Sequence, residues 1–110
     1  MSKEICTHEG NSLDIVFHVT DPKGCVFDLG TVTAVRFGLS SSPRRNADMV
    51  LTLGDGVLIS DATKGVITVQ LDAKHTAEVG RRVYELTVEV GKDVYTAATG
   101  EIEILPSILA

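Results

Sequence analysis

Apolar and polar residues alternate with a period of two along four segments of this chain, and the 3.6-residue period of an amphipathic helix is almost absent. The apolar positions of the four segments are Leu13, Ile15, Phe17 and Val19; Val35, Phe37 and Leu39; Tyr84, Leu86, Val88 and Val90; and Ile102 and Ile104. Successive side chains of a strand point to opposite faces of a sheet. The pattern therefore predicts strands with one face on a core and the other in water.

Turn-forming residues separate the predicted strands, which include segments at 31–40, 49–53, 66–71, 94–99 and 101–105. Asp21-Pro22-Lys23-Gly24 has the proline and glycine placement of a tight turn, and a short strand at 25–27 is expected to return from it. Gly54-Asp55-Gly56 is interpreted as a hairpin turn, and Gly91-Lys92-Asp93 as the turn of the clearest hairpin in the chain. The one helical signal is the segment 72–79, which is long enough for one or two turns.

These elements predict about eight short strands and one short helical turn, which is the make-up of a small all-β sandwich. The chain has 110 residues and 44% of them are hydrophobic, enough for a single core without metal or disulfide support. We therefore expect one domain over residues 1–110. Its expected ends are a short flexible N-terminus at 1–3 and an apolar C-terminal tail at 106–110.

The formal net charge of −5 argues against nucleic acid and against an anionic membrane surface as partners, because both attract basic proteins. The longest apolar runs have the length of strands, so no membrane-spanning segment is expected. The sequence begins Met1-Ser2-Lys3-Glu4 without the apolar core of a secretory signal. We expect synthesis in a cytoplasm.

The two cysteines are predicted to be free thiols that are mostly buried. Cys6 precedes the predicted strand 12–20, and Cys25 follows the turn that ends it. If the segments fold back antiparallel, that strand separates the two residues by well over ~15 Å. A disulfide requires Cα atoms within about 7 Å of each other.

No combination of residues in the sequence points to an enzyme, a metal site or a cofactor. Cys6 and His8 are the nearest candidates for a nucleophile and its base, but no nucleophile turn accompanies them. His8, His18 and His75 fall on separate elements without the spacing of metal ligands. The expected catalytic, cofactor and metal residues are therefore none.

Carbohydrate binding is a common role of β-sandwiches, and it usually relies on exposed aromatic rings. The chain has no tryptophan, and Phe17, Phe37 and Tyr84 occupy positions expected in the core. Tyr95 is the one aromatic residue expected to provide an exposed platform, and packing within its hairpin accounts for it equally well.

Three features are typical of protein-interaction surfaces. Arg44 and Arg45 lie in a polar loop of an otherwise acidic chain, where they can clamp carboxylates of a partner or remain solvated. Ile108 and Leu109 make the C-terminal tail apolar, so it is expected to dock either on its own sheet or on a neighbouring molecule. The third feature is a group of apolar residues on the nominally wet face, which form a patch only if they are contiguous. They are Val16, Val83 and Val94.

The order of motifs along the chain resembles a known family. A Gly-Asn-Ser opening precedes "LDIVFHVTDPKGCVFDL" and "TVTAVRFGL"; a "DATKGVITVQLDAKHTAEVG" unit leads into "RRVYELTVEV"; and "TGEIEIL" closes the pattern. This arrangement resembles the immunoglobulin-like β-sandwich modules of virion proteins of tailed bacteriophages and prophages, including the N-terminal domains of phage baseplate upper proteins. The resemblance covers residues 10–105.

The resemblance implies an immunoglobulin-like antiparallel β-sandwich and a non-enzymatic virion structural protein. Such a protein is an accessory subunit that docks by protein–protein contacts on the capsid surface or on the tail and baseplate. The implied partners are other virion proteins and further copies of the chain, and the implied location is the virion. The residues expected to carry these contacts are Arg44, Arg45, Ile108 and Leu109. The alternative is an adhesion or carbohydrate-binding β-sandwich module.

Overall fold

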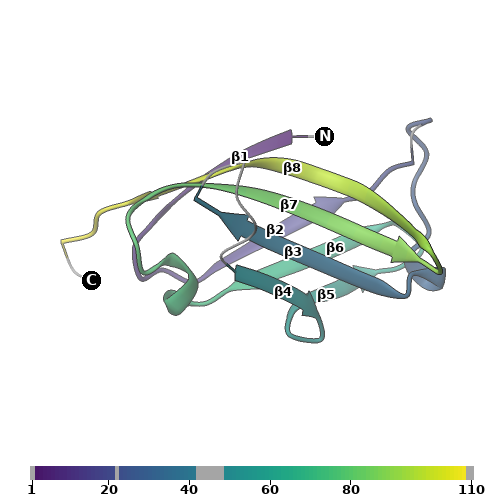
Figure 1. The fold of residues 1–110 in the computed structure, drawn as a ribbon, viewed down its shortest axis with the longest axis horizontal. Coiled ribbons are helices and arrows are strands. Elements are labelled where there is room, and N and C mark those ends of the chain that lie inside the picture. Colours follow the sequence, from purple (N-terminus) through teal and green to yellow (C-terminus); the bar gives the residue numbers. More distant parts are fainter. Residues whose placement is uncertain (1, 22, 42–48, 109–110) are drawn as a thin grey trace.

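A computed structural model describes residues 2–21, 23–41 and 49–108 of the chain (Figure 1). This part of the chain contains eight strands and two 3-10 turns: β1 (Ser2–His8), β2 (Leu13–His18), η1 (Leu29–Thr31), β3 (Ala34–Ser40), β4 (Met49–Leu53), β5 (Gly56–Asp61), β6 (Val66–Leu71), η2 (Ala73–Thr76), β7 (Gly80–Val90) and β8 (Asp93–Leu105). The prediction of an all-β protein with about eight strands is confirmed.

The strands of the described residues form one sheet in the order β1-β8-β7-β3-β4-β5-β6-β2. The sheet curls so that β8, β7, β3 and β4 lie in front of β2, β6 and β5 in Figure 1. The result is a nearly closed, barrel-like sheet, in which the end strands β1 and β2 are not hydrogen-bonded neighbours.

Two pairs of neighbouring strands are parallel, so the expectation of a purely antiparallel arrangement is wrong. β1 runs parallel to β8, and β4 runs parallel to β5 over Thr52–Gly56 and Leu53–Val57. The segment 54–56 is therefore not a hairpin turn. The N–H of Asp55 donates to the Thr52 carbonyl at 2.8 Å and that of Gly54 to the Val57 carbonyl at 2.9 Å, which moves the chain sideways by one strand without reversing it.

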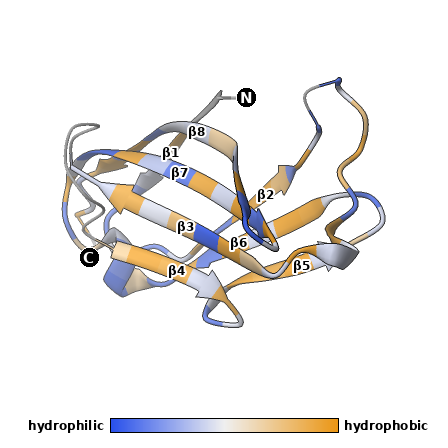
Figure 2. Ribbon diagram, turned by 45° about the vertical axis from the view of Figure 1, so that its right-hand side comes forward, coloured by the Kyte–Doolittle hydropathy of each residue, from blue (hydrophilic) through white to orange (hydrophobic). Residues whose placement is uncertain are grey.

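The core lies inside the curled sheet, on the faces that the alternation predicted. Phe17, Phe37 and Tyr84 are at most 2% exposed and form one aromatic cluster, with ring centroids 5.6–6.1 Å apart. Hydrophobic and hydrophilic positions alternate along β3 and β7 in Figure 2. Burial of these apolar surfaces is the main force that holds such a fold together.

Several of the predicted strand and helix segments are shorter in the structure, because hydrogen bonds within local turns replace those of the sheet or helix. The segment 25–27 is not a strand, and only an isolated bridge joins Thr20 to Val26. The predicted strand 31–40 begins later, at Ala34, because η1 precedes it and the Asp28 carboxylate accepts the Gly30 N–H. The predicted helical segment 72–79 forms only the 3-10 turn η2.

β8 is one continuous strand where the sequence suggested two. Its pairing with β7 shifts register between Leu86 and Thr87, so Ala97 forms a bulge opposite them. The bulge lets one long strand bend around the core where a break was expected.

Both cysteines are free, as predicted, but both are exposed, so the predicted burial is wrong. Cys6 lies between Ile5 and Thr7 on β1, and it points outward because its neighbours point inward. Cys25 lies in the loop after β2, away from the core. Within the described residues, no helix is long and apolar enough to cross a membrane.

Candidate functional site

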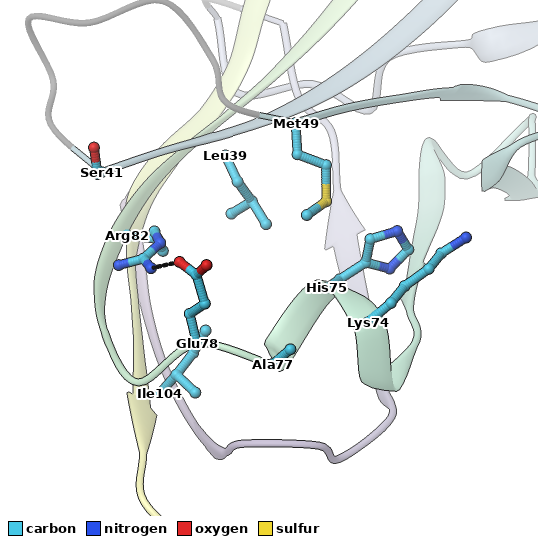
Figure 3. Close-up of a pocket in the computed structure, with 9 residues that line it drawn as sticks. All are labelled: Leu39, Ser41, Met49, Lys74, His75, Ala77, Glu78, Arg82 and Ile104. Carbon is cyan, nitrogen blue, oxygen red and sulfur yellow. Dashed lines mark hydrogen bonds and ion pairs between the residues drawn. The ribbon is translucent and has the colours of Figure 1, made fainter.

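A pocket with a volume of about 460 Å³ lies at one end of the barrel (Figure 3). Five elements line it: the strands β3, β4, β7 and β8, and the turn η2. The residue after β3 and the segment after η2 supply the rest. The lining residues are Leu39, Ser41, Met49, Lys74, His75, Ala77, Glu78, Arg82 and Ile104. We call this the loop-end groove because Ser41 and Met49 flank the segment 42–48.

The floor of the loop-end groove is apolar. Leu39 is 4% exposed and Ile104 is 3% exposed, and Met49 lies partly buried beside them. Figure 3 shows the Leu39 and Met49 side chains extending into the space between the charged residues. An apolar centre with a charged rim is the usual arrangement of a protein–protein contact surface.

Backbone hydrogen bonds hold η2 in place along one wall of the groove. The N–H of Asp72 donates to Nδ1 of His75 at 2.8 Å, so a neutral His75 carries its proton on Nε2. The Thr76 hydroxyl donates to the Asn11 carbonyl at 2.7 Å, and the Gly10 N–H donates to the Thr76 carbonyl at 3.1 Å. The two bonds of Thr76 fix η2 to the β1–β2 turn.

The opposite wall carries an ion pair. Arg82 Nη2 lies 3.1 Å from Glu78 Oε2, and its Nη1 donates to the Arg81 carbonyl at 2.9 Å. The Arg82 side chain is only 20% exposed, whereas Glu78 is 86% exposed. Because Glu78 is so exposed, the pair adds little stability, and its carboxylate is accessible to a partner.

A second pocket of about 320 Å³ continues the groove past η2. It shares Met49, Lys74 and His75 with the first pocket and adds the carboxylates of Asp55 and Asp72. The two pockets together present cationic and anionic side chains around an apolar strip. This chemistry suits a polypeptide with both apolar and charged side chains.

Of the four residues predicted from the sequence to bind partners, the structure places one. Ile108 is fully exposed, with a relative accessibility of 101%, so it does not dock on its own sheet. Arg44, Arg45 and Leu109 lie outside the described residues. The last described residues and η2 lie at the same end of the molecule (Figure 1).

The groove residues Met49, Lys74, Glu78 and Arg82 were not predicted as a site. They come from two separate parts of the chain, at position 49 and in the segment 74–82, and no motif joins them. The one local signal is the spacing of Glu78 and Arg82, which have opposite charges four residues apart.

The three valines on the nominally wet face do not make one surface on adjacent strands. Val83 is only partly exposed, while Val16 is 43% and Val94 60% exposed. Val16 lies on β2 and Val94 on β8, which are not neighbours in the sheet.

Among the described residues, no group of three histidine, cysteine, aspartate or glutamate side chains is placed to hold a metal ion. Cys6 and His8 lie two residues apart on the exposed side of β1. Comparison of the whole chain with protein-family models and with curated proteins finds no match.

Proposed function

We propose that this protein is a non-enzymatic structural subunit of the virion of a tailed bacteriophage or prophage. It docks as an accessory subunit on the capsid surface or on the tail and baseplate. The resemblance of its strand and turn motifs over residues 10–105 supports this assignment. In this proposal the fold is an immunoglobulin-like β-sandwich, with β1-β8-β7-β3-β4 as one layer and β5-β6-β2 as the other. The short β4–β5 junction, only two residue pairs long, supports that division.

The observation that carries the docking role is the composition of the barrel end around the loop-end groove. An apolar floor, charged residues of both signs and the fully exposed Ile108 occupy the same end. Ile108 is an apolar side chain in water, and its burial against a partner would gain about 1.5–3 kcal/mol. The partners are other virion proteins or further copies of the chain, not nucleic acid or membrane, and the assembled protein resides in the virion after synthesis in the host cytoplasm.

The edge strand β1 offers a second mode of contact. The Glu9 N–H donates to the Leu105 carbonyl at 2.8 Å, which continues the parallel β1–β8 ladder. In a parallel ladder, alternate residues direct their backbone groups to the same neighbour. The backbone N–H and carbonyl groups of Ile5 and Thr7 therefore point toward β8, and those of Cys6 point away from it. An extended segment of a partner can add there as a further strand.

The first test is quantitative mass spectrometry of gradient-purified particles from the strain that encodes the chain. A copy number that follows the major capsid protein would indicate capsid decoration, and a small fixed number would indicate the tail or baseplate. Absence from particles would refute the virion role.

The second test compares variants of the proposed docking residues with a control variant. Ile108→Asp combined with Lys74→Glu, and separately Arg44→Ala combined with Arg45→Ala, should reduce incorporation into particles at least about 10-fold, which corresponds to ~1.4 kcal/mol. Arg36→Glu, at an exposed position within β3 that lines neither end of the barrel, is the matched control and should be incorporated normally. Equal incorporation of all variants, with unchanged melting temperatures, would exclude these residues as docking contacts.

A carbohydrate-binding module is the second candidate function, and the exposure of Tyr95 favours it. Tyr95 is 45% exposed and its ring contacts that of Phe27, with centroids 6.1 Å apart. Binding on a glycan array that disappears with Tyr95→Ala would support this candidate, and an array without binding would exclude it.

A further inference from the structure

A separate pocket of about 260 Å³ lies at the opposite end of the barrel from the loop-end groove. It is formed by the loop after β2, the last residue of η1 and the β7–β8 hairpin. Its lining residues are Asp21, Val26, Phe27, Asp28, Thr31, Val90 and Tyr95. Val90 ends β7 and Tyr95 is near the start of β8, whereas the loop-end groove takes its residues from the other ends of these strands. We call this the hairpin-end pocket.

An aromatic pair forms one side of the hairpin-end pocket. The Phe27 and Tyr95 rings are inclined by 60° with centroids 6.1 Å apart. Phe27 is partly buried against the core and supports Tyr95, which remains 45% exposed. The Tyr95 ring is thus held in one position while part of it stays open to a ligand.

The charge of the pocket is negative. Oδ1 of Asp21 accepts the N–H groups of Lys23 and Cys25, both at 2.9 Å, and Oδ1 of Asp28 accepts the Gly30 N–H at 2.8 Å. These bonds orient both carboxylates, and each has a second oxygen without a partner among the described residues. The described lining includes no lysine or arginine, and Lys23 lies in the same turn without lining the pocket.

We propose that the hairpin-end pocket binds the guanidinium group of an arginine side chain from a partner protein. A guanidinium is flat, so it stacks on a tyrosine ring, and its paired N–H groups match a carboxylate. The two negative charges favour a cation over a neutral sugar, because a sugar would make a favourable contact only with the Tyr95 ring. A lysine ammonium satisfies the charge but lacks the planar fork. That the arginine belongs to a partner protein rests on the docking role proposed above. The binding of a guanidinium group by the pocket does not depend on that role.

The test is a titration of the ¹⁵N-labelled protein followed by NMR, with argininamide, lysinamide, norleucinamide and methyl glucoside as probes. We expect argininamide to shift the backbone signals around Asp21, Asp28 and Tyr95 in a saturable way, with a dissociation constant on the order of millimolar. Norleucinamide, which lacks the side-chain charge, should bind at least about 10-fold more weakly, and lysinamide should fall between them.

Isosteric variants separate charge from shape. Asp21→Asn combined with Asp28→Asn keeps the oxygen that accepts the backbone N–H groups and removes both charges, so folding should persist while argininamide affinity falls at least about 5-fold. Tyr95→Leu should produce a similar loss. Asp93→Asn, in the same hairpin but not lining the pocket, is the control and should bind normally.

Equal binding of argininamide and norleucinamide, or undiminished binding by the double asparagine variant, would overturn the proposal. Saturable binding of methyl glucoside alone would overturn it in favour of a carbohydrate site. Arginine binding by a protein that is absent from particles would support the pocket and refute only the virion role.

Discussion

At the scale of single residues, Gly65 shows how a close approach of backbone segments constrains the sequence. The Val19 N–H donates to the Gly65 carbonyl at 2.8 Å, which ties the end of β2 to the β5–β6 turn. Gly65 has φ of +69°, and a Cβ there would lie 2.7 Å from the carbonyl oxygens of both Val19 and Phe27. The Val19 oxygen also accepts the Phe27 N–H at 3.1 Å, so it cannot move away without weakening that bond.

We predict that Gly65→Ala lowers the free energy of unfolding by about 3 kcal/mol or more, because it combines backbone strain with a steric clash. Gly24→Ala is the control, since Gly24 has φ of +85° but nothing lies within 4 Å of its would-be Cβ. That change should cost only about 1 kcal/mol. Urea denaturation of the two variants would measure the difference, and equal losses would contradict the role of the contact.

At the scale of elements, η2 is a short 3-10 turn that could not persist by itself. Thr76 is 0% exposed and joins η2 to the β1–β2 turn through its hydroxyl and its carbonyl. The position of one wall of the loop-end groove therefore depends on this threonine.

We predict that Thr76→Val lowers the free energy of unfolding by about 1–3 kcal/mol, because the Asn11 carbonyl loses its buried donor while the shape of the side chain is retained. Thr76→Ser keeps the donor and should leave the NMR signals of His75 nearly unchanged, whereas Thr76→Val should shift them. Thermal unfolding and NMR spectra of both variants would check this. If Thr76→Val left both quantities unaltered, the hydroxyl would have no part in placing η2.

At the scale of the whole molecule, strands from the two ends of the chain are hydrogen-bonded to each other. β1 covers β8 from Thr99 to Leu105, and β7 pairs with the other edge of β8. β1 therefore protects about half of a 13-residue strand from contact with other molecules.

We predict that deletion of residues 1–8 leaves the β-rich circular dichroism spectrum but lowers the melting temperature, because the packing of Ile5 and Thr7 is lost. The shortened chain should also self-associate, since the newly open edge of β8 can pair with a second copy. Analytical ultracentrifugation over a range of concentrations would detect this. A monomeric shortened chain with an unchanged melting temperature would show that β1 contributes neither packing nor protection.

The sequence by itself determined the class of the fold and most of the core. Alternation is a local property, so β4 and β6 have the predicted bounds, and Phe17, Phe37 and Tyr84 are buried as expected. Turn chemistry is also local, and the turn between β7 and β8 follows from Gly91 and its neighbours. The apolar character of the C-terminal tail is visible in the sequence, but the exposure of Ile108 is known only from the structure, and its role in binding stays a prediction.

The tertiary structure alone decided which strands pair and where the sites lie. Nothing local distinguishes a hairpin at 54–56 from a sideways step into a parallel neighbour, because the strands on either side determine the direction. The same holds for the exposed Cys6, whose outward orientation follows from the pairing of β1 with β8. The loop-end groove and the hairpin-end pocket each join residues that are far apart in sequence. They therefore exist only once the sheet has curled and brought the ends of its strands together.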